Sequence, residues 1–433
     1  MTYSALAGAA GLTVIAVALG RAQAPPRDTL RLADLQAAAA QGDPRQREFE
    51  LQRTATALRL RSLDAERLPT LAADGVGQYQ SDVTAIPIRL PNVSVPSPPH
   101  DTYDARVSVQ ERLFDATIGT RRDVERAQLA ESEARLRATL YALRGEVNDA
   151  FFTAALMQAR AGELTAVIAD LEAQLRVARA RVREGTALPS EAATLEAELL
   201  RRRQDESEVS ATRRASLAVL AALTGRAITE RDTLILPQFG TTAEIPRDSI
   251  PHARPEYEQF ARTRARLAQQ ERLITAGLQP QLSAFVRAGY GKPGLNFLSD
   301  RFESYWLGGL QVHWAPWSWG TSQRDRQLLE VQREIVSRDE EAFTAATRRA
   351  TQRLLADIDR LQVVLRTDDE IIALRERIER ETRRRFDEAV ITAAEYVDRR
   401  NDVFAARLAR AGHEVELAQA RTRYLTTIGV ELP

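Results

Sequence analysis

The chain has 433 residues, 28% of them charged, and its 60 basic side chains balance its 60 acidic ones. A chain with zero net charge has no overall electrostatic attraction to nucleic acid, so no nucleic-acid partner is expected. The absence of cysteine excludes disulfides, thiolate metal sites and cysteine nucleophiles. Four scattered histidines form no metal cluster, and a composition rich in Ala, Leu, Arg and Glu indicates long helices.

The first apolar run, residues 5–20, is followed by Ala22-Gln23-Ala24, which has the small-residue spacing of a signal cleavage site. About 16 residues is short for a membrane-spanning helix, which needs roughly 20. We therefore expect residues 1–24 to be an export signal, with an uncleaved N-terminal anchor as the alternative. No later run could span a membrane as a helix, so a crossing would need another architecture.

The rest of the sequence contains the same pattern of residues twice. Anchor residues recur in the same order and at a nearly constant offset. The matched pairs are Pro69 with Pro280, Leu71 with Leu282, Tyr79 with Tyr290, Val109 with Val312, and Gly225 with Gly429. We therefore expect two tandem repeats, residues 25–225 and 253–429, joined by a linker or equatorial segment, 226–252.

Each repeat predicts a helix, a pair of strands, a long helix, a turn and a return helix. Pro69 stops the first helix, and Gly225 is a candidate C-cap of the first return helix. The elements expected in the first repeat are a helix over 30–68, strands over about 71–80 and 103–114, a long helix over 115–183 and a return helix over 190–224. Those expected in the second are a helix over 253–278, strands over about 281–290 and 303–314, a long helix over 318–387 and a return helix over 393–428.

The strand over 103–114 shows a period of two, because Tyr103, Ala105, Val107 and Val109 alternate with polar residues. One face of the strand would then be apolar and the other polar. Segments of about ten residues with aromatic ends suit the strands of a transmembrane barrel. Four strands cannot close a barrel, and open edges in lipid would leave backbone groups unpaired. Three chains sharing twelve strands are therefore expected.

The long helix over 115–183 carries the clearest periodicity. From Leu136 to Val182 its apolar residues keep alternating spacings of four and three, which is the pattern of a coiled-coil seam. Asp115 is a plausible N-cap. A helix of about 69 residues spans roughly 100 Å. The two shorter helices of the repeat together match that length, so we expect them to stack end to end beside it, as in a tube.

The order of these features resembles that of the TolC-type outer-membrane efflux proteins. The resemblance covers residues from about 30 to 429. It rests on the paired halves, on Leu-Phe-Asp at 113–115 and on Arg-Pro-Glu at 254–256. It implies a mainly α fold with a small β part, in which long coiled-coil helical hairpins form two tandem repeats, each with two transmembrane strands. It also implies a homotrimer with a 12-stranded barrel continued by an α-helical tunnel in the periplasm.

The function implied by the resemblance is that of an outer-membrane exit duct for tripartite efflux or type I secretion. The duct would be a passive conduit whose partners are its own copies, outer-membrane lipid, a periplasmic adaptor (a membrane fusion protein) and an inner-membrane pump. The alternative is a periplasmic coiled-coil structural or adaptor protein without a pore. The sequence carries no catalytic constellation, so neither an enzyme nor a cofactor is expected.

The two turns between the long and return helices are where the resemblance places the adaptor. In the first turn the candidate docking residues are Gly185, Thr186, Leu188 and Pro189; in the second they are Val390 and Ile391. Ala389 stands where the family has a turn glycine. An exposed Val390-Ile391 pair would suit a docking surface. The alternative is that both turns are simple connectors.

Just beyond the second turn, Glu395 and Asp398 lie one helical turn apart and share a face. In the TolC-type proteins, carboxylates at this place line the narrowest ring of the tunnel. By the resemblance, these two residues would form a periplasmic gate or selectivity ring that attracts cations. Because Arg399 and Arg400 follow closely, the alternative is a solvated face with local ion pairs.

Four tryptophans are expected to gather near the second strand-to-helix joint: Trp306, Trp314, Trp317 and Trp319. We interpret them as an interfacial aromatic girdle, since indole buries its ring while its N–H stays near water. A substrate-stacking site is the alternative.

Overall fold

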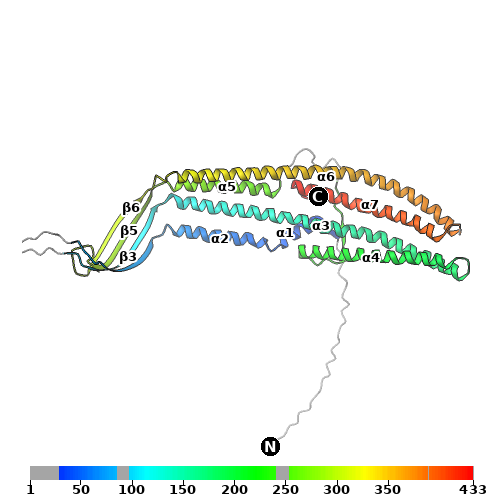
Figure 1. The fold of residues 1–433 in the computed structure, drawn as a ribbon, viewed down its shortest axis with the longest axis horizontal. Helices are drawn as coiled ribbons and strands as arrows, with labels where there is room; N and C mark the ends of the chain where they lie inside the picture. Colours follow the sequence, from blue (N-terminus) through cyan, green and yellow to red (C-terminus); the bar gives the residue numbers. More distant parts are fainter. Residues whose placement is uncertain (1–28, 85–96, 240–252, 389, 433) are drawn as a thin grey trace, which may run out of the picture.

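The computed structural model describes residues 29–84, 97–239, 253–388 and 390–432. The expected export signal, residues 1–24, lies outside these ranges. The fold is elongated: helices lie side by side along its length, the long strands gather at one end and the turns between helices lie at the other (Figure 1). We call these the sheet end and the hairpin end.

Each half contains one very long helix and shorter helices beside it. At 1.5 Å per residue, the long helices α3 and α6 each extend roughly 100 Å. The shorter helices follow one another along the long one, as their lengths predict (Figure 1). The helices are α1 (Leu32–Gly42), α2 (Gln46–Ala65), α3 (Ala116–Arg183), α4 (Pro189–Thr224), α5 (Pro255–Ala276), α6 (Thr321–Asp387) and α7 (Ala393–Ile428).

The expected single helix over 30–68 is wrong. Residues Thr29–Arg31 form a short strand, β1, and the helix that follows breaks between α1 and α2 at Asp43-Pro44. Proline disfavours a helical conformation in the residue before it, and Asp43 is indeed extended, with ψ 130°. β1 pairs in parallel with β4 (Thr233–Ile235), which lies within the expected linker.

The other four strands form one antiparallel sheet. They are β2 (Thr70–Tyr79), β3 (Asp101–Phe114), β5 (Gln281–Lys292) and β6 (Glu303–His313), in the order β2-β3-β5-β6. Strands from the two halves therefore meet at the β3–β5 pair. No helix within the described ranges has a stretch that is both long and apolar enough to cross a lipid bilayer.

The predicted seam of α3 forms the core of the helical part. From Leu136 to Ala178 most of its members are buried, and they pack against α4 and α7 in clusters at mid-length and near the hairpin end. The expected caps are confirmed. The carboxylate of Asp115 accepts a hydrogen bond from the amide of Thr117 at 2.9 Å, and Gly225 ends α4 with φ 65°.

Candidate functional site

One face of the four-stranded sheet is apolar across all four strands. The register sets Val109 between Leu71 and Val286, and it sets Val107 between Ala73 and Ala288. The alternate residues in 71–79, 103–109, 282–290 and 304–312 share this face, and none of them is charged. Beyond these ranges the register adds Glu111, Asp101 and Lys292 to the same face. Large side chains on it are open to solvent in the single chain, such as Leu71 at 72% exposure. Such a face favours an apolar environment outside the chain.

The opposite face is polar, and some of its charges are paired. Arg106 lies 3.5 Å from both Asp74 and Asp104. Tyr305 of β6 donates to Asp104 of β3 at 2.5 Å, although β5 lies between those strands. Its ring crosses β5 at Gly289, where an added Cβ would meet the ring at 2.5 Å. The sequence showed the alternation of polar residues but not this contact, which depends on the strand order.

Aromatic side chains mark both ends of the apolar face. Trp314, Trp317 and Trp319 lie just beyond β6 at the helix side, all exposed, with the Trp314 indole N–H donating to the carbonyl of Leu278 at 3.1 Å. The expected gathering of all four tryptophans is wrong for Trp306. That residue pairs with Ala288, roughly 27 Å along the strand from Trp314.

At the outer end of the sheet the structure adds an aromatic stack that sequence reasoning missed. Phe302 lies between Tyr103 and Tyr290, with ring centroids 6.1 and 5.6 Å away. Two aromatic levels separated by a mostly apolar band, in which Glu111 is the charged residue, have the spacing of a barrel wall, whose apolar band is about 25 Å tall. Period-two spacing could have suggested the two tyrosines, but Phe302 lies in a loop.

The first turn at the hairpin end is compact. Gly185 has φ 72°, a conformation that favours glycine, and the Thr186 hydroxyl donates to the carbonyl of Arg181 at 3.1 Å. Pro189 occupies the first turn of α4, where its missing N–H costs nothing. Leu188 projects from this turn with 66% of its side chain exposed.

The second turn lies beside the first. Arg181 donates from Nη2 to the carbonyl of Asp387 at 3.0 Å, which joins the ends of α3 and α6. Val390 is 62% exposed, as expected, but Ile391 is half-buried against the core of the hairpin end. The predicted exposed pair is therefore wrong for Ile391. Ala389 lies outside the described residues.

Glu395 and Asp398 both lie exposed on the first turns of α7. The face of α7 that carries Val397 and Phe404 is turned inward, because both side chains are buried among residues of α3, α4 and α6. In the described part of the chain neither carboxylate forms an ion pair. Arg399 instead contacts Asp402 at 3.3 Å. The two acids thus share an open surface one helical turn from the docking turns.

Sequence reasoning missed a cluster that joins α3, α6 and α7 beside these acids. Asp170 of α3 lies 3.2 Å from Arg400 and accepts from the hydroxyl of Tyr396 at 3.3 Å. Arg400 also contacts Glu379 of α6 at 3.4 Å. Burial, reinforced by the Asp170 carboxylate, raises the pKa of Tyr396, so its hydroxyl keeps the proton that it donates. No sequence signal could find this cluster, because Asp170 and Tyr396 lie 226 positions apart.

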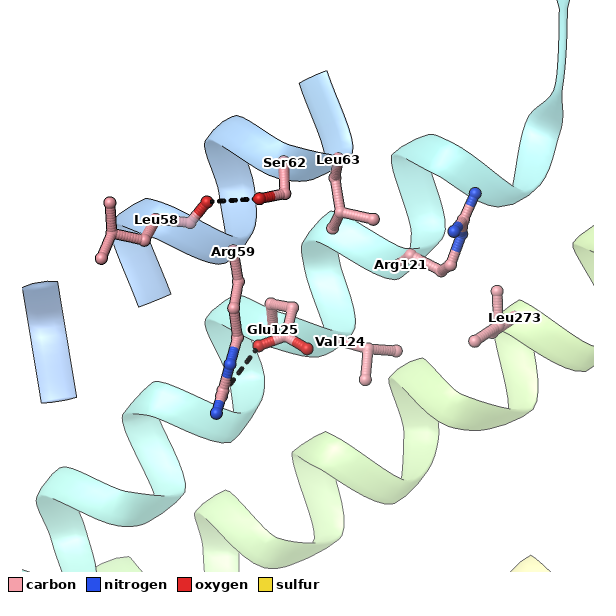
Figure 2. A pocket seen from close by; sticks show the side chains of 8 residues that line it. All are labelled: Leu58, Arg59, Ser62, Leu63, Arg121, Val124, Glu125 and Leu273. Carbon is pink, nitrogen blue, oxygen red and sulfur yellow. Dashed lines mark hydrogen bonds and ion pairs between the residues drawn. The ribbon is translucent and has the colours of Figure 1, made fainter. Parts of the chain in front are cut away.

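A shallow groove of about 470 Å³ lies between α2, α3 and α5, near the sheet end (Figure 2). Its polar side chains bond to their own surroundings: Arg59 to Glu125 at 3.4 Å, and Ser62 to the carbonyl of Leu58 at 3.1 Å. The remaining lining is largely apolar, with Leu63, Val124 and Leu273. Among the described residues, no group of three or more His, Asp or Glu side chains could hold a metal ion.

No protein-family model matches the sequence, and no curated protein matches it. Solved structures do match. The channel protein CusC aligns with a TM-score of 0.68 and 14% identity, over 92% of each chain. The Campylobacter jejuni CmeC outer membrane channel aligns at 0.65 and 14%, over 93% of this chain and 86% of that one. The open state of the Neisseria gonorrhoeae MtrE outer membrane channel aligns at 0.64 and 16%, over 93% and 89%.

At this level of identity the likeness shows a shared fold. The predicted resemblance to the TolC-type channels is therefore confirmed for the fold, over nearly all of the described chain. The expected class, mainly α with a small β part, is confirmed as well.

Proposed function

We propose that the chain is one subunit of an outer-membrane channel, in which three copies close a 12-stranded barrel continued by a periplasmic helical tunnel. The observation that carries this proposal is the four-stranded sheet, which has one mostly apolar, exposed face and two edges that no described strand pairs. In lipid such edges would each leave backbone groups unsatisfied at a cost of several kcal/mol. Closure by further copies removes them.

The arrangement of the helices also supports closure of the channel by further copies of the chain. Its order is α2-α3-α5-α6, so α2 and α6 continue the two sheet edges. Both outer helices expose apolar side chains at helical spacing, with Leu51 and Leu58 on α2, and Leu328, Val331 and Ile335 on α6. Packing α6 of one copy against α2 of the next would cover both stripes and the groove of Figure 2.

The channel is a passive exit duct for tripartite efflux or type I secretion, energised by an inner-membrane pump. The turns at Leu188 and Val390 meet a periplasmic adaptor, and Glu395 and Asp398 form a cation-attracting ring. Support for these roles is the exposure of all four side chains together at the end farthest from the sheet. The fold shared with outer membrane channels supports this orientation.

The test is fractionation followed by reconstitution. We expect a heat-stable trimer in outer-membrane fractions, and the purified protein should open ion-conducting pores in planar bilayers. A soluble periplasmic monomer would support the alternative, a coiled-coil structural or adaptor protein without a pore. That alternative does not explain the mostly apolar, exposed face of the sheet.

A further inference from the structure

The two halves of the chain pack their helices in the same register. In the first half, Arg122 of α3 contacts Asp64 of α2 at 3.1 Å. In the second half, Arg326 of α6 donates to the hydroxyl of Thr275 of α5 at 3.2 Å. The offset from Asp64 to Thr275 is that of the repeated prolines before the strands, and the offset from Arg122 to Arg326 is that of the repeated glycines after the return helices. Residue by residue, α5 and α6 therefore correspond to α2 and α3.

The contact between the halves shows how these helices meet on their other side. α3 packs against α5 in the middle of the layer α2-α3-α5-α6 (Figure 1). Across this contact, Arg137 of α3 lies 3.1 Å from Glu258 of α5. Because α6 corresponds to α3 and α2 corresponds to α5, α6 of one copy and α2 of the next would meet in the same way.

At the matching places on the two outer helices the charges are reversed. Glu341 of α6 corresponds to Arg137 of α3. Arg47 of α2 corresponds to Glu258 of α5. The side chain of Glu341 is 65% exposed and pairs with Arg338 of its own helix, which is equally exposed, so this pair contributes little. Arg47 is exposed and forms no ion pair within the described ranges. An acid on α6 and a base on α2 are thus both accessible to another copy.

The centre of the contact differs between the two cases as well. Within the chain, Glu131 of α3 is only 3% exposed and forms an ion pair with Arg266 of α5. The corresponding residues on the outer helices are Ile335 of α6 and Ala55 of α2. Ile335 is 54% exposed in the single chain. The contact between copies would therefore be apolar where the contact within the chain is charged.

We propose that Glu341 of one copy and Arg47 of the next form an ion pair, and that the reversed charges decide which helix each edge of the chain accepts. If α3 met α2 of another copy in place of its own α5, Arg137 would lie against Arg47, and the buried Glu131 would lose its cation. If α6 met α5 of another copy, Glu341 would lie against Glu258. Both exchanges bring like charges together, so the halves alternate around the ring. The inference rests on the proposed function, because it needs copies that meet edge to edge.

The first test is charge reversal with rescue in the full-length protein. Arg47→Glu and Glu341→Arg should each lower the yield of outer-membrane trimer roughly tenfold, because every trimer has three such contacts and a like-charge pair replaces an attraction in each. The double variant restores opposite charges and should recover the parent yield. Glu416→Arg is the control, since it reverses an exposed acid on α7, which lies between α3 and α6. Parent yields from both single variants, or no recovery in the double variant, would overturn the pair.

The second test is crosslinking, which has no background because the sequence contains no cysteine. With Arg47→Cys and Glu341→Cys in one chain, a short bis-maleimide should join copies into covalent dimers and trimers on a denaturing gel. Arg137→Cys with Glu258→Cys, the matching pair within the chain, should be bridged without joining copies. Arg47→Cys with Asp325→Cys, which lies roughly 24 Å from Glu341 along α6, should give no covalent trimer. A parent chain that forms no trimer would overturn the proposed function and the pair together. A parent trimer whose copies are not joined through positions 47 and 341 would overturn the pair alone.

Discussion

At the scale of single residues, burial separates two kinds of charge near the hairpin end. Glu395 and Asp398 are exposed and form no ion pair within the described ranges. Arg400, a few residues further on, is 18% exposed and contacts two carboxylates on two other helices. Exposed charges can attract or repel ions in the surrounding water, whereas the partly buried cluster forms ion pairs that hold the helices together. The two kinds of charge therefore call for different measurements.

For the exposed acids, replacing Glu395 and Asp398 with Ala should lower the preference of the pore for cations and weaken block by multivalent cations. Stability should change little, because solvated carboxylates contribute little to packing. The measurement is the reversal potential across a salt gradient in a planar bilayer. Glu416→Ala, another exposed acid on α7, is the control. If the double variant keeps the wild-type reversal potential, these residues do not line the constriction.

For the partly buried cluster, Arg400→Ala should leave Asp170 and Glu379 without their counter-charge. We expect α6 and α7 near the hairpin end to lose about 1.5–3 kcal/mol of local stability, the range for hydrogen bonds to charged groups. Hydrogen exchange of the backbone amides in 379–404 should then accelerate. Arg410→Ala removes an exposed pair with Asp369 and should leave exchange unchanged. If the amides exchange at similar rates in both variants, Arg400 does not hold these helices together.

At the scale of elements, the strands and the turns have opposite requirements. The strands need one mostly apolar face, and the register supplies it by aligning four segments of period two. The turns need apolar side chains that stay exposed, and Gly185 and Pro189 allow this by closing the first turn with backbone geometry rather than with a buried core. Both arrangements leave apolar surface that only another molecule can cover.

In the strands, Val109→Arg places a charge in the middle of the apolar face. It should cost about 2–4 kcal/mol if that face lies near the bilayer midplane, and the yield of assembled trimer should fall. Gln110→Arg, one residue along and on the polar face, is the matched control and should assemble normally. The measurement is trimer in outer-membrane fractions by unheated gel electrophoresis. Equal yields from the two variants would contradict the membrane placement of this face.

In the turns, Leu188→Asp with Val390→Asp should abolish transport while the trimer and its pore activity stay intact. Both side chains are exposed, so the loss would come from a partner and not from folding. Ile391 is unsuitable for this test because it packs into the core. Leu188→Met with Val390→Ile keeps the surface apolar and should preserve transport. Export by the double-aspartate variant at the wild-type rate would leave the turns as simple connectors.

At the scale of the whole molecule, one chain forms an open layer with two free edges. Its sheet and its helical layer end in the same two edges, β2 with α2 and β6 with α6. Each edge exposes either unpaired backbone or apolar side chains, and in the proposed channel a heterologous contact between the two unlike edges would close three copies into a ring. The proposed channel therefore depends on contacts between copies of the chain.

This closure predicts the effect of charges on the helix edges. Leu58→Glu on α2 and Val331→Glu on α6 should each reduce trimer, since both side chains are more than half exposed in the single chain. Helical content by circular dichroism should be unchanged, because neither residue belongs to a buried cluster. Glu330→Gln, beside Val331, is the control. Normal trimer from both glutamate variants would mean that these helices do not meet.

The sequence by itself determined the elements that depend on local periodicity and on residues with restricted backbones. The seam from Leu136 onward fixes one face of α3, the period of two fixes the faces of β3, and the caps at Asp115 and Gly225 follow from side-chain and backbone chemistry near each helix end. These signals act over a few residues, so no tertiary information is needed to find them. The break at Asp43-Pro44 is equally local, but a prediction of one helix from the average composition of residues 30–68 does not include it.

Only the tertiary structure decided which distant residues meet. Tyr305 reaches Asp104 because β5 lies between their strands with a glycine at the crossing point, and Asp170 meets Tyr396 because two hairpins pack together. The inward turn of Ile391 and the separation of Trp306 from the other tryptophans were likewise set by packing and register. Each of these contacts joins segments that periodicity treats as independent, and their relative placement depends on how the whole core packs.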